Sequence, residues 1–406
     1  MNAPSIYDLS PLLRMMATGI VLALGPIIWV WRRKRGGTQV PRLHALTLFT
    51  LFLTFDLILF GAFTRLTDSG LGCPDWPGCY GNASPMGAQA DISVAQSAMP
   101  SGPVTRSKAW IEMIHRYLAT GVGVLILVLA VAGWLRLKQK PAAPGAAVGH
   151  HPASPGPSPW WATATLVWVC VQGAFGALTV TMKLFPAIVT LHLMGGLILL
   201  ALLAVQVARQ NQSDSGAAPV AVSAATRVFL WLTLCALALQ IALGGWVSTN
   251  YAVLACGEFP RCQGRWWPEM DFEEGFQIWR GLGLTPLGEH IHFAALTAIH
   301  YAHRLMAALV LLMLGALAWV LNGTAGLRLP SRWLAALTGL QLATGLGNVV
   351  LGWPLLAALL HTGGAAALLV VLAWVASISQ TGPKTKTKTK PAPPWGGSTV
   401  SRLKHE

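Results

Sequence analysis

Long, uninterrupted stretches of apolar residues dominate the chain, and shorter segments between them carry most of its charges. The hydrocarbon core of a bilayer is about 30 Å thick and needs about 20 residues of helix to cross it. Because the apolar runs are continuous rather than alternating, they exclude a membrane β-barrel. We therefore predict an all-α polytopic membrane protein. Its nine spans are expected at about 15–31, 44–64, 112–135, 160–180, 186–207, 227–248, 294–321, 333–352 and 356–377.

The last eight predicted spans form two blocks of four that carry the same landmarks in the same order. Each block has a helix ending near a glycine, a loop with a C-x5-C pair, a His-Arg helix, a Gln-x-x-x-Gly helix, and a helix with a histidine followed by two adjacent glycines. Such an ordered repeat indicates duplication. We predict two tandem, pseudo-symmetric four-helix bundles plus one extra N-terminal transmembrane helix.

This repeat divides the chain into five parts. The extra helix and its basic loop occupy residues 1–43, and a linker rich in Ser, Gly and Ala separates the two halves. The remaining boundaries are 44–210 for the first half, 211–226 for the linker, 227–378 for the second half and 379–406 for a basic tail.

Composition and charge agree with a membrane protein. Hydrophobic residues make up 54% of the chain and charged residues only 10%, which excludes a soluble enzyme, a disordered scaffold and a small disulfide-rich protein. The net charge of +14 does not indicate nucleic acid binding, because the basic residues gather in short inter-helix segments and the tail, where they set topology. We expect a bacterial inner-membrane protein with a cytoplasmic tail and periplasmic cysteine loops, 65–111 and 249–293.

Four histidines lie inside predicted spans, where polar groups are costly and usually functional. His115 and His192 lie at a similar depth in the first half, as do His303 and His361 in the second. Two imidazoles facing each other in a bundle core can ligate a haem iron. The glycine pairs that follow two of these histidines leave room for a flat macrocycle. Helix packing is the alternative, and zinc is disfavoured because a third local ligand is missing.

Charged residues beside the histidines distinguish the two halves. Glu112 lies three residues before His115, on the same face of the helix, whereas the second half has His300 at the corresponding position. A carboxylate at this depth could exchange protons or stabilise a cationic intermediate, or it could complement a helix N-terminus. Arg116 and Arg304 are candidates to pair with haem propionates. We expect chemistry in one half and electron transfer or stabilisation in the other.

The cysteine pairs Cys73/Cys79 and Cys256/Cys262 fall in the two predicted outer loops. On the oxidising side of a membrane, disulfides are expected. Prolines and glycines around the cysteines favour compact turns, so close pairing within Cys73–Cys79 and within Cys256–Cys262 is plausible. Both a structural staple and a redox function remain open.

The run from Arg65 to Cys79 (RLTDSGLGCPDWPGC), followed by Glu112-Met-Ile-His115-Arg116, closely resembles the haem A synthase family. The similarity extends to the second His-Arg helix and to both His-glycine helices. This resemblance implies an oxidoreductase with two four-helix halves. It would oxidise the C8 methyl group of haem O to a formyl group and so supply haem A for terminal oxidases.

The resemblance covers about residues 44–378 and also implies cofactors, partners and residue roles. Haem O is the implied substrate, haem b the cofactor, and haem O synthase and oxidase assembly factors the partners, with self-association of the chain as a further expectation. The implied roles are catalysis for Glu112, substrate haem binding for His115, His192 and Arg116, haem b binding for His303, His361 and Arg304, and an outer-loop disulfide for Cys73–Cys79.

Two other functions fit the residues alone. A bis-histidine di-haem cytochrome would carry electrons between a quinol and an acceptor and would not need Glu112. A haem transporter or chaperone would hold exchangeable haem and form no new product. The sequence assigns no role to His290, His292 or His300.

Overall fold

The computed structural model describes residues 10–32, 41–138 and 158–381 of the chain. Within these ranges nine helices are long and apolar enough to cross a membrane, which confirms the predicted all-α polytopic fold. The spans are α1 (Ser10–Arg32), α2 (Arg42–Leu66), α4 (Arg106–Lys138), α5 (Pro159–Thr181), α6 (Pro186–Ser215), α7 (Ala224–Thr249), α9 (Phe293–Asn322), α10 (Arg328–Val350) and α11 (Leu355–Ile378).

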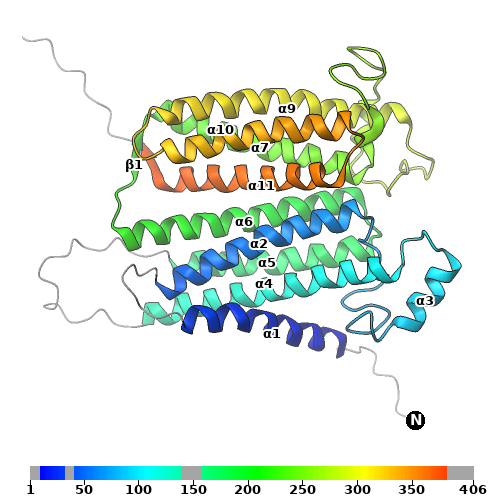
Figure 1. Cartoon of the computed structure of the whole chain (residues 1–406), viewed down its shortest axis with the longest axis horizontal. Helices are drawn as coiled ribbons and strands as arrows, with labels where there is room; N and C mark the ends of the chain where they lie inside the picture. The colour runs from blue at the N-terminus through cyan, green and yellow to red at the C-terminus, as the bar shows by residue number, and fades with distance from the viewer. Residues whose placement is uncertain (1–9, 33–40, 139–157, 382–406) are drawn as a thin grey trace, which may run out of the picture.

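The remaining elements are short and lie in the loops or at the ends of the bundle. They are α3 (Gln89–Ala98), the 3₁₀ helix η1 (Ala252–Ala255), α8 (Phe272–Gly275), β1 (Val220–Val222) and β2 (Ser379–Thr381). Figure 1 places α3 and the cysteine loops at one end of the long helices and β1 at the other. These ends are called the cysteine-loop end and the linker end below.

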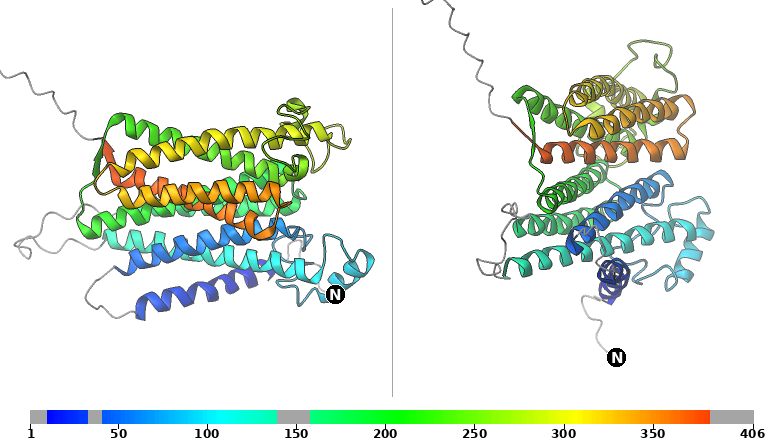
Figure 2. Two further views of the ribbon diagram at one scale, coloured as in Figure 1. Left: turned by 45° about the horizontal axis from the view of Figure 1, so that its top comes forward. Right: turned by 60° about the vertical axis from the view of Figure 1, so that its left-hand side comes forward.

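The long helices form two groups that match the two predicted halves. Figures 1 and 2 show α2, α4, α5 and α6 on one side and α7, α9, α10 and α11 on the other. The groups meet where α6 packs against α7 and α11, and where α2 packs against α11. Buried leucines from both halves, among them Leu200, Leu203, Leu314 and Leu372, belong to one continuous apolar core. The extra helix α1 lies outside this interface, against α4.

Local signals explain several helix ends. Ser158 caps α5 by accepting a hydrogen bond from Trp160 N, and Pro159 occupies the first turn, where a missing N–H costs nothing. Gly216 ends α6 in the left-handed conformation, with φ of 65°, which glycine adopts without strain. Before this cap, the polar residues 209–215 continue α6 beyond its apolar stretch.

The linker between the halves is more ordered than predicted. The segment 211–226 is predicted only as a linker rich in Ser, Gly and Ala, but its first residues belong to α6, and Val220–Val222 forms β1, which pairs in parallel with β2. Arg227 Nη1 also donates a hydrogen bond of 2.7 Å to Ser379 O. This pairing ties the linker to the end of the last helix. Low local hydrophobicity does not reveal it, because the partner strand lies more than 150 residues away.

A second tie joins the halves at the cysteine-loop end. Arg65 Nη2, at the end of α2, donates a 2.5 Å hydrogen bond to Ser248 O of α7. Its guanidinium carbon lies 4.1 Å from the centroid of the Tyr251 ring, and the Tyr251 hydroxyl donates to the Asp68 carboxylate at 2.6 Å. Burial and this hydrogen bond raise the pKa of Tyr251, so the phenol keeps the proton that it donates.

Candidate functional site

The first-half histidines each lie against a glycine of a neighbouring helix. A Cβ atom on Gly61 of α2 would lie 3.0 Å from Nε2 of His115, and one on Gly176 of α5 would lie 3.3 Å from Cε1 of His192. The ring of Phe60 stacks on His115, with centroids 6.3 Å apart and planes 9° from parallel. Both imidazoles are therefore turned toward other helices of their bundle.

The second half repeats this arrangement. A Cβ atom on Gly244 of α7 would lie 3.0 Å from Cε1 of His303, and one on Gly345 of α10 would lie 3.2 Å from Cε1 of His361. Any larger residue at these glycines would press on the ring. The repeat seen in the sequence is thus also present in three dimensions. In each half, two imidazoles, from α4 and α6 or from α9 and α11, pack against a glycine of a neighbouring helix.

The glycine pairs that follow two of the histidines serve a different purpose from the one expected. A Cβ atom on Gly195 would lie 2.1 Å from Gln172 Oε1, and one on Gly364 would lie 2.2 Å from Gln341 Nε2. The space is filled by glutamine amides, which donate to the backbone oxygens of His192 (2.6 Å) and His361 (3.0 Å). The expectation that these glycines make room for a macrocycle is wrong for Gly195 and Gly364.

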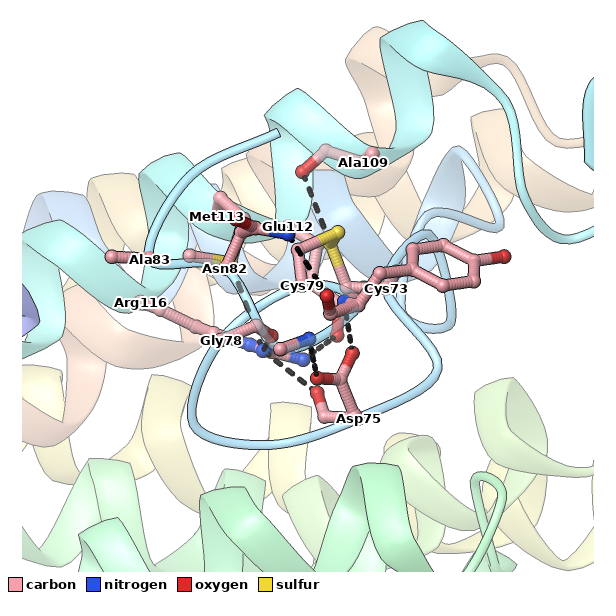
Figure 3. The surroundings of a disulfide bond; sticks show 12 residues. Cys73, Asp75, Gly78, Cys79, Asn82, Ala83, Ala109, Glu112, Met113 and Arg116 are labelled. Carbon is pink, nitrogen blue, oxygen red and sulfur yellow. Dashed lines mark hydrogen bonds and ion pairs between the residues drawn. A yellow bond between two sulfur atoms is a disulfide. The ribbon is translucent and has the colours of Figure 1, made fainter. Parts of the chain in front are cut away.

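Glu112 lies in a buried cluster with Arg116 and the first cysteine loop (Figure 3). Its carboxylate accepts from Arg116 Nη2 at 2.6 Å and from the backbone N–H of Cys73 at 2.7 Å. Only 4% of Glu112 and 8% of Arg116 are exposed. Cys73 is disulfide-bonded to Cys79. Arg116 Nη1 donates to three carbonyl oxygens of the same loop, those of Asp75, Pro77 and Gly78.

This cluster changes two expectations from the sequence. Both Nη atoms of Arg116 are bound to protein groups, so its guanidinium holds the disulfide loop rather than facing outward as a free partner for a propionate. Glu112 and His115 also contact different neighbours, since the carboxylate binds the loop while the imidazole packs against α2. The sequence could not reveal either point, because backbone carbonyls carry no sequence signature.

The second cysteine loop has a related cluster, in which no carboxylate among the described residues forms an ion pair with the arginine. Arg304 Nη2 and Nη1 donate to the backbone oxygens of Cys256 (2.6 Å) and Arg261 (3.2 Å), and Cys256 is bonded to Cys262. Arg304 Nε donates to His300 Nε2 at 3.1 Å, while His300 Nδ1 lies 3.0 Å from Ala252 O. Since an arginine N–H only donates, His300 Nε2 must accept and Nδ1 carries the proton. His300 is therefore a neutral replacement for the carboxylate.

Two further histidines of the second loop stand apart from these clusters. The backbone of His290 pairs with that of Leu284 in an isolated antiparallel β-bridge. His292 precedes α9, and its Nδ1 lies 2.7 Å from the Glu274 carboxylate, whose hydrogen bond raises the pKa of the imidazole. The His292 side chain is 71% exposed, so its contact with Glu274 is a surface ion pair.

The donor set fits haem ligation better than a bound metal ion. Among the residues that the structure describes, no three His, Cys, Asp or Glu side chains come together to hold a metal ion. Paired imidazoles on facing helices of a bundle are typical axial ligands of a haem iron. Gln172, Gln240 and Thr344 each contact an imidazole Nδ1 at 3.0–3.1 Å, the nitrogen on the far side of the ring from a ligating Nε2, and Gln240 Nε2 also lies 3.4 Å from His303 Nε2.

Comparison with known proteins places the chain in a family. Residues 44–373 match the model of the cytochrome oxidase assembly protein family, which covers most of the chain. The chain belongs to this family. A haem A synthase of Shewanella oneidensis is 38% identical over 323 residues, which span 80% of this chain and 92% of the relative. A haem A synthase of Rhizorhabdus wittichii is 26% identical over 365 residues, covering 84% of this chain and 95% of the relative.

The helix that precedes the family match contacts the same site. Met15 of α1 is only 5% exposed and packs in one cluster with Cys73, Cys79 and Met113. Farther along α1, a Cβ atom on Gly19 would lie 2.5 Å from Thr120 Cγ2 of α4. In this member of the family, α1 thus covers the disulfide and the back of the helix that carries Glu112.

Proposed function

We propose that this chain is a haem A synthase, which oxidises the C8 methyl group of haem O to a formyl group. The observation that carries the proposal is the position of Glu112. It is a buried carboxylate, held between a disulfide loop and the helix of His115, and its counterpart in the second half is His300. Membership of the family and the names of the relatives support the same activity.

In the first half, His115 and His192 bind the substrate haem, and Glu112 accepts protons. Oxidising a methyl group to an aldehyde adds one oxygen atom, here supplied by water, and removes electrons and protons in successive steps, so the site needs an electron acceptor and a proton acceptor. Glu112 is buried and has Arg116 as its ion-pair partner, which keeps the carboxylate ionised without a water shell, in the form that can accept a proton. Arg116 keeps the carboxylate in place and fixes the loop above it.

In the second half, His303 and His361 hold a haem b cofactor, which supplies one-electron redox chemistry when bound. His300, a neutral imidazole beside the Arg304 guanidinium, offers no proton acceptor comparable to the Glu112 carboxylate. Arg304 fixes the second disulfide loop over the His303 helix, as Arg116 does in the first half. In this proposal the first half oxidises the substrate haem and the second half transfers electrons.

The protein lies in a bacterial inner membrane, with its cysteine loops in the periplasm and its tail in the cytoplasm. The partners that fit this activity are haem O synthase, which makes the substrate, and oxidase assembly factors, which take the product. A second copy of the chain is a further candidate partner.

Reporter fusions test this orientation. Fusions after Lys138 and after Arg328 should report a cytoplasmic location, because both residues are at the linker end. A fusion after Gln89, at the cysteine-loop end, should report a periplasmic location. A periplasmic signal after Lys138 would contradict the proposed orientation.

Extraction of the pigments tests the activity. The chain is expressed in a bacterium that makes haem O but lacks its own haem A synthase, and the haems are separated by chromatography and identified by mass. Haem A, or haem O with a hydroxylated methyl group, is expected. Haem B alone would instead indicate a di-haem cytochrome, and bound haem O that exchanges but never changes would indicate a transporter.

A further inference from the structure

One carboxylate lies near the middle of a span and is exposed on the outside of the bundle. Asp56 belongs to α2, which begins at Arg42 and ends at Leu66. At a rise of about 1.5 Å per residue, Asp56 lies about 21 Å along the helix from Arg42 and about 15 Å from Leu66. An aspartate side chain is too short to reach either membrane surface, as a long lysine or arginine side chain can. The carboxylate is therefore held at the depth of the lipid tails.

The Asp56 carboxylate has no partner in the described part of the chain. The residue is exposed, and among the described residues no hydrogen bond or ion pair reaches its side chain. Glu112 differs, because it is buried and paired with Arg116. Ionisable residues within a membrane almost always face the protein interior or pair with one another. Asp56 does neither.

The repeat shows that the fold does not need a carboxylate at this position. Gly61 and Gly244 are matching positions, since each lies against the first histidine of its own half. Asp56 lies five residues before Gly61, and Leu239 lies five residues before Gly244. Leu239 is 53% exposed, so α7 presents an ordinary apolar side chain to the lipid at the same place. The packing that the two halves share therefore does not explain Asp56.

The same face of α2 already packs against another helix nearer the linker end. Phe49 lies seven residues before Asp56, which places both on one face of the helix. The ring centroid of Phe49 lies 6.2 Å from that of Trp29 of α1. Closer to the cysteine-loop end, α1 contacts α4 instead, as at Gly19. This leaves Asp56 uncovered together with Phe52, which is 61% exposed.

We propose that this face of α2, centred on Phe52 and Asp56, docks a transmembrane helix of another membrane protein that carries a lysine, arginine or histidine near its middle. A cation is the partner that fits, because it both bonds the carboxylate and cancels its charge. A symmetric contact with a second copy of this chain would instead bring two Asp56 carboxylates together. The described spans also expose no basic side chain near their middles that a second copy could supply. This docking does not depend on which reaction the two histidine sites carry out.

Photo-crosslinking in the native membrane tests the proposal. A photoreactive phenylalanine derivative replaces Phe52 in the full-length chain, and the adducts formed on illumination are purified and identified by mass spectrometry of their peptides. The expected adduct joins position 52 to a transmembrane segment of another protein, with a basic residue near the middle of that segment. The same probe at Cys235, the matching exposed position on α7, should give lipid adducts only.

Charge variants separate recognition from accidental contact. Asp56→Leu should lower the yield of the adduct about 3–30-fold, the range for one polar contact between helices in a bilayer. Asp56→Lys should abolish the adduct, and replacing the partner's basic residue by Asp should then restore it. The proposal is overturned by an adduct with a second copy of this chain, by lipid adducts alone, by the same adduct from Cys235, or by a yield that does not depend on the charge at position 56.

The stability of the purified chain provides an independent measurement. Asp56→Leu should not lower the midpoint of thermal unfolding in detergent, because the carboxylate has no partner among the described residues. Leu239→Asp, the matched substitution on α7, should lower the midpoint, because it places an unpaired carboxylate among lipid tails. A lower midpoint for Asp56→Leu would mean that Asp56 stabilises its own chain, and would refute a role in docking.

Discussion

Replacing Glu112 by Gln should abolish most conversion of haem O while leaving the second-half haem bound. Glutamine keeps the shape of the side chain, and its single carbonyl oxygen can still accept from either Arg116 Nη2 or Cys73 N, which bind different oxygens of the carboxylate. It cannot accept a proton from the substrate, and groups that do so contribute about 10²–10⁴-fold to a rate. The loss should appear as a fall in the ratio of haem A to haem O in extracted pigment.

The repeat provides a matched control for this variant. His300 occupies the same position in the second half and contacts Arg304 in place of Arg116. His300→Gln should reduce haem A production much less than Glu112→Gln, because it removes no carboxylate. Near-normal haem A from Glu112→Gln, with the protein folded, would leave Glu112 as a structural anchor of the disulfide loop.

Replacing His361 by Ala should remove the low-spin signal of haem b. A low-spin bis-imidazole iron needs both axial nitrogens, and His361 is held by Thr344 and by Gln341, which donates to its backbone oxygen. Alanine leaves the second bond intact, so the helix should stay in place while the ligand is lost. Optical and electron paramagnetic resonance spectra of the purified protein would measure the change.

The first half again supplies the control. His192→Ala removes the matching ligand of the first bundle and should leave the low-spin haem b spectrum unchanged. If His192→Ala abolished that signal and His361→Ala did not, the assignment of the two sites would have to be exchanged.

The sequence predicted the helices and their repeat because both depend on local chemistry. An apolar run of about 20 residues must form a helix in a bilayer, and each predicted span falls within or close to the helix observed there. The family was also predicted correctly, because the first cysteine loop carries a specific motif. Glu112 and the four histidines could be selected because polar residues in a span are rare and costly.

What the sequence could not predict depends on contacts between distant segments. The bonds of Arg116 go to backbone oxygens of a loop about 40 residues away, and backbone oxygens are the same at every position. The glycines beside the histidine rings, such as Gly244 and Gly345, belong to other helices. Their role requires knowing which helices are neighbours. Gln240 shows the same limit, since it lies in α7 and its partner His303 lies in α9.

The interface between the halves is tied at both membrane faces, and this bears on how fast an electron can cross it. β1 pairs with β2 at one end, while Arg65 binds Ser248 O and Tyr251 packs on Arg65 at the other. With both ends joined, a hinge motion that separates the halves has to break contacts at one end or the other. Under the proposed function, electrons would then cross between the two histidine pairs over a distance set by the packing of α2 and α6 against α11.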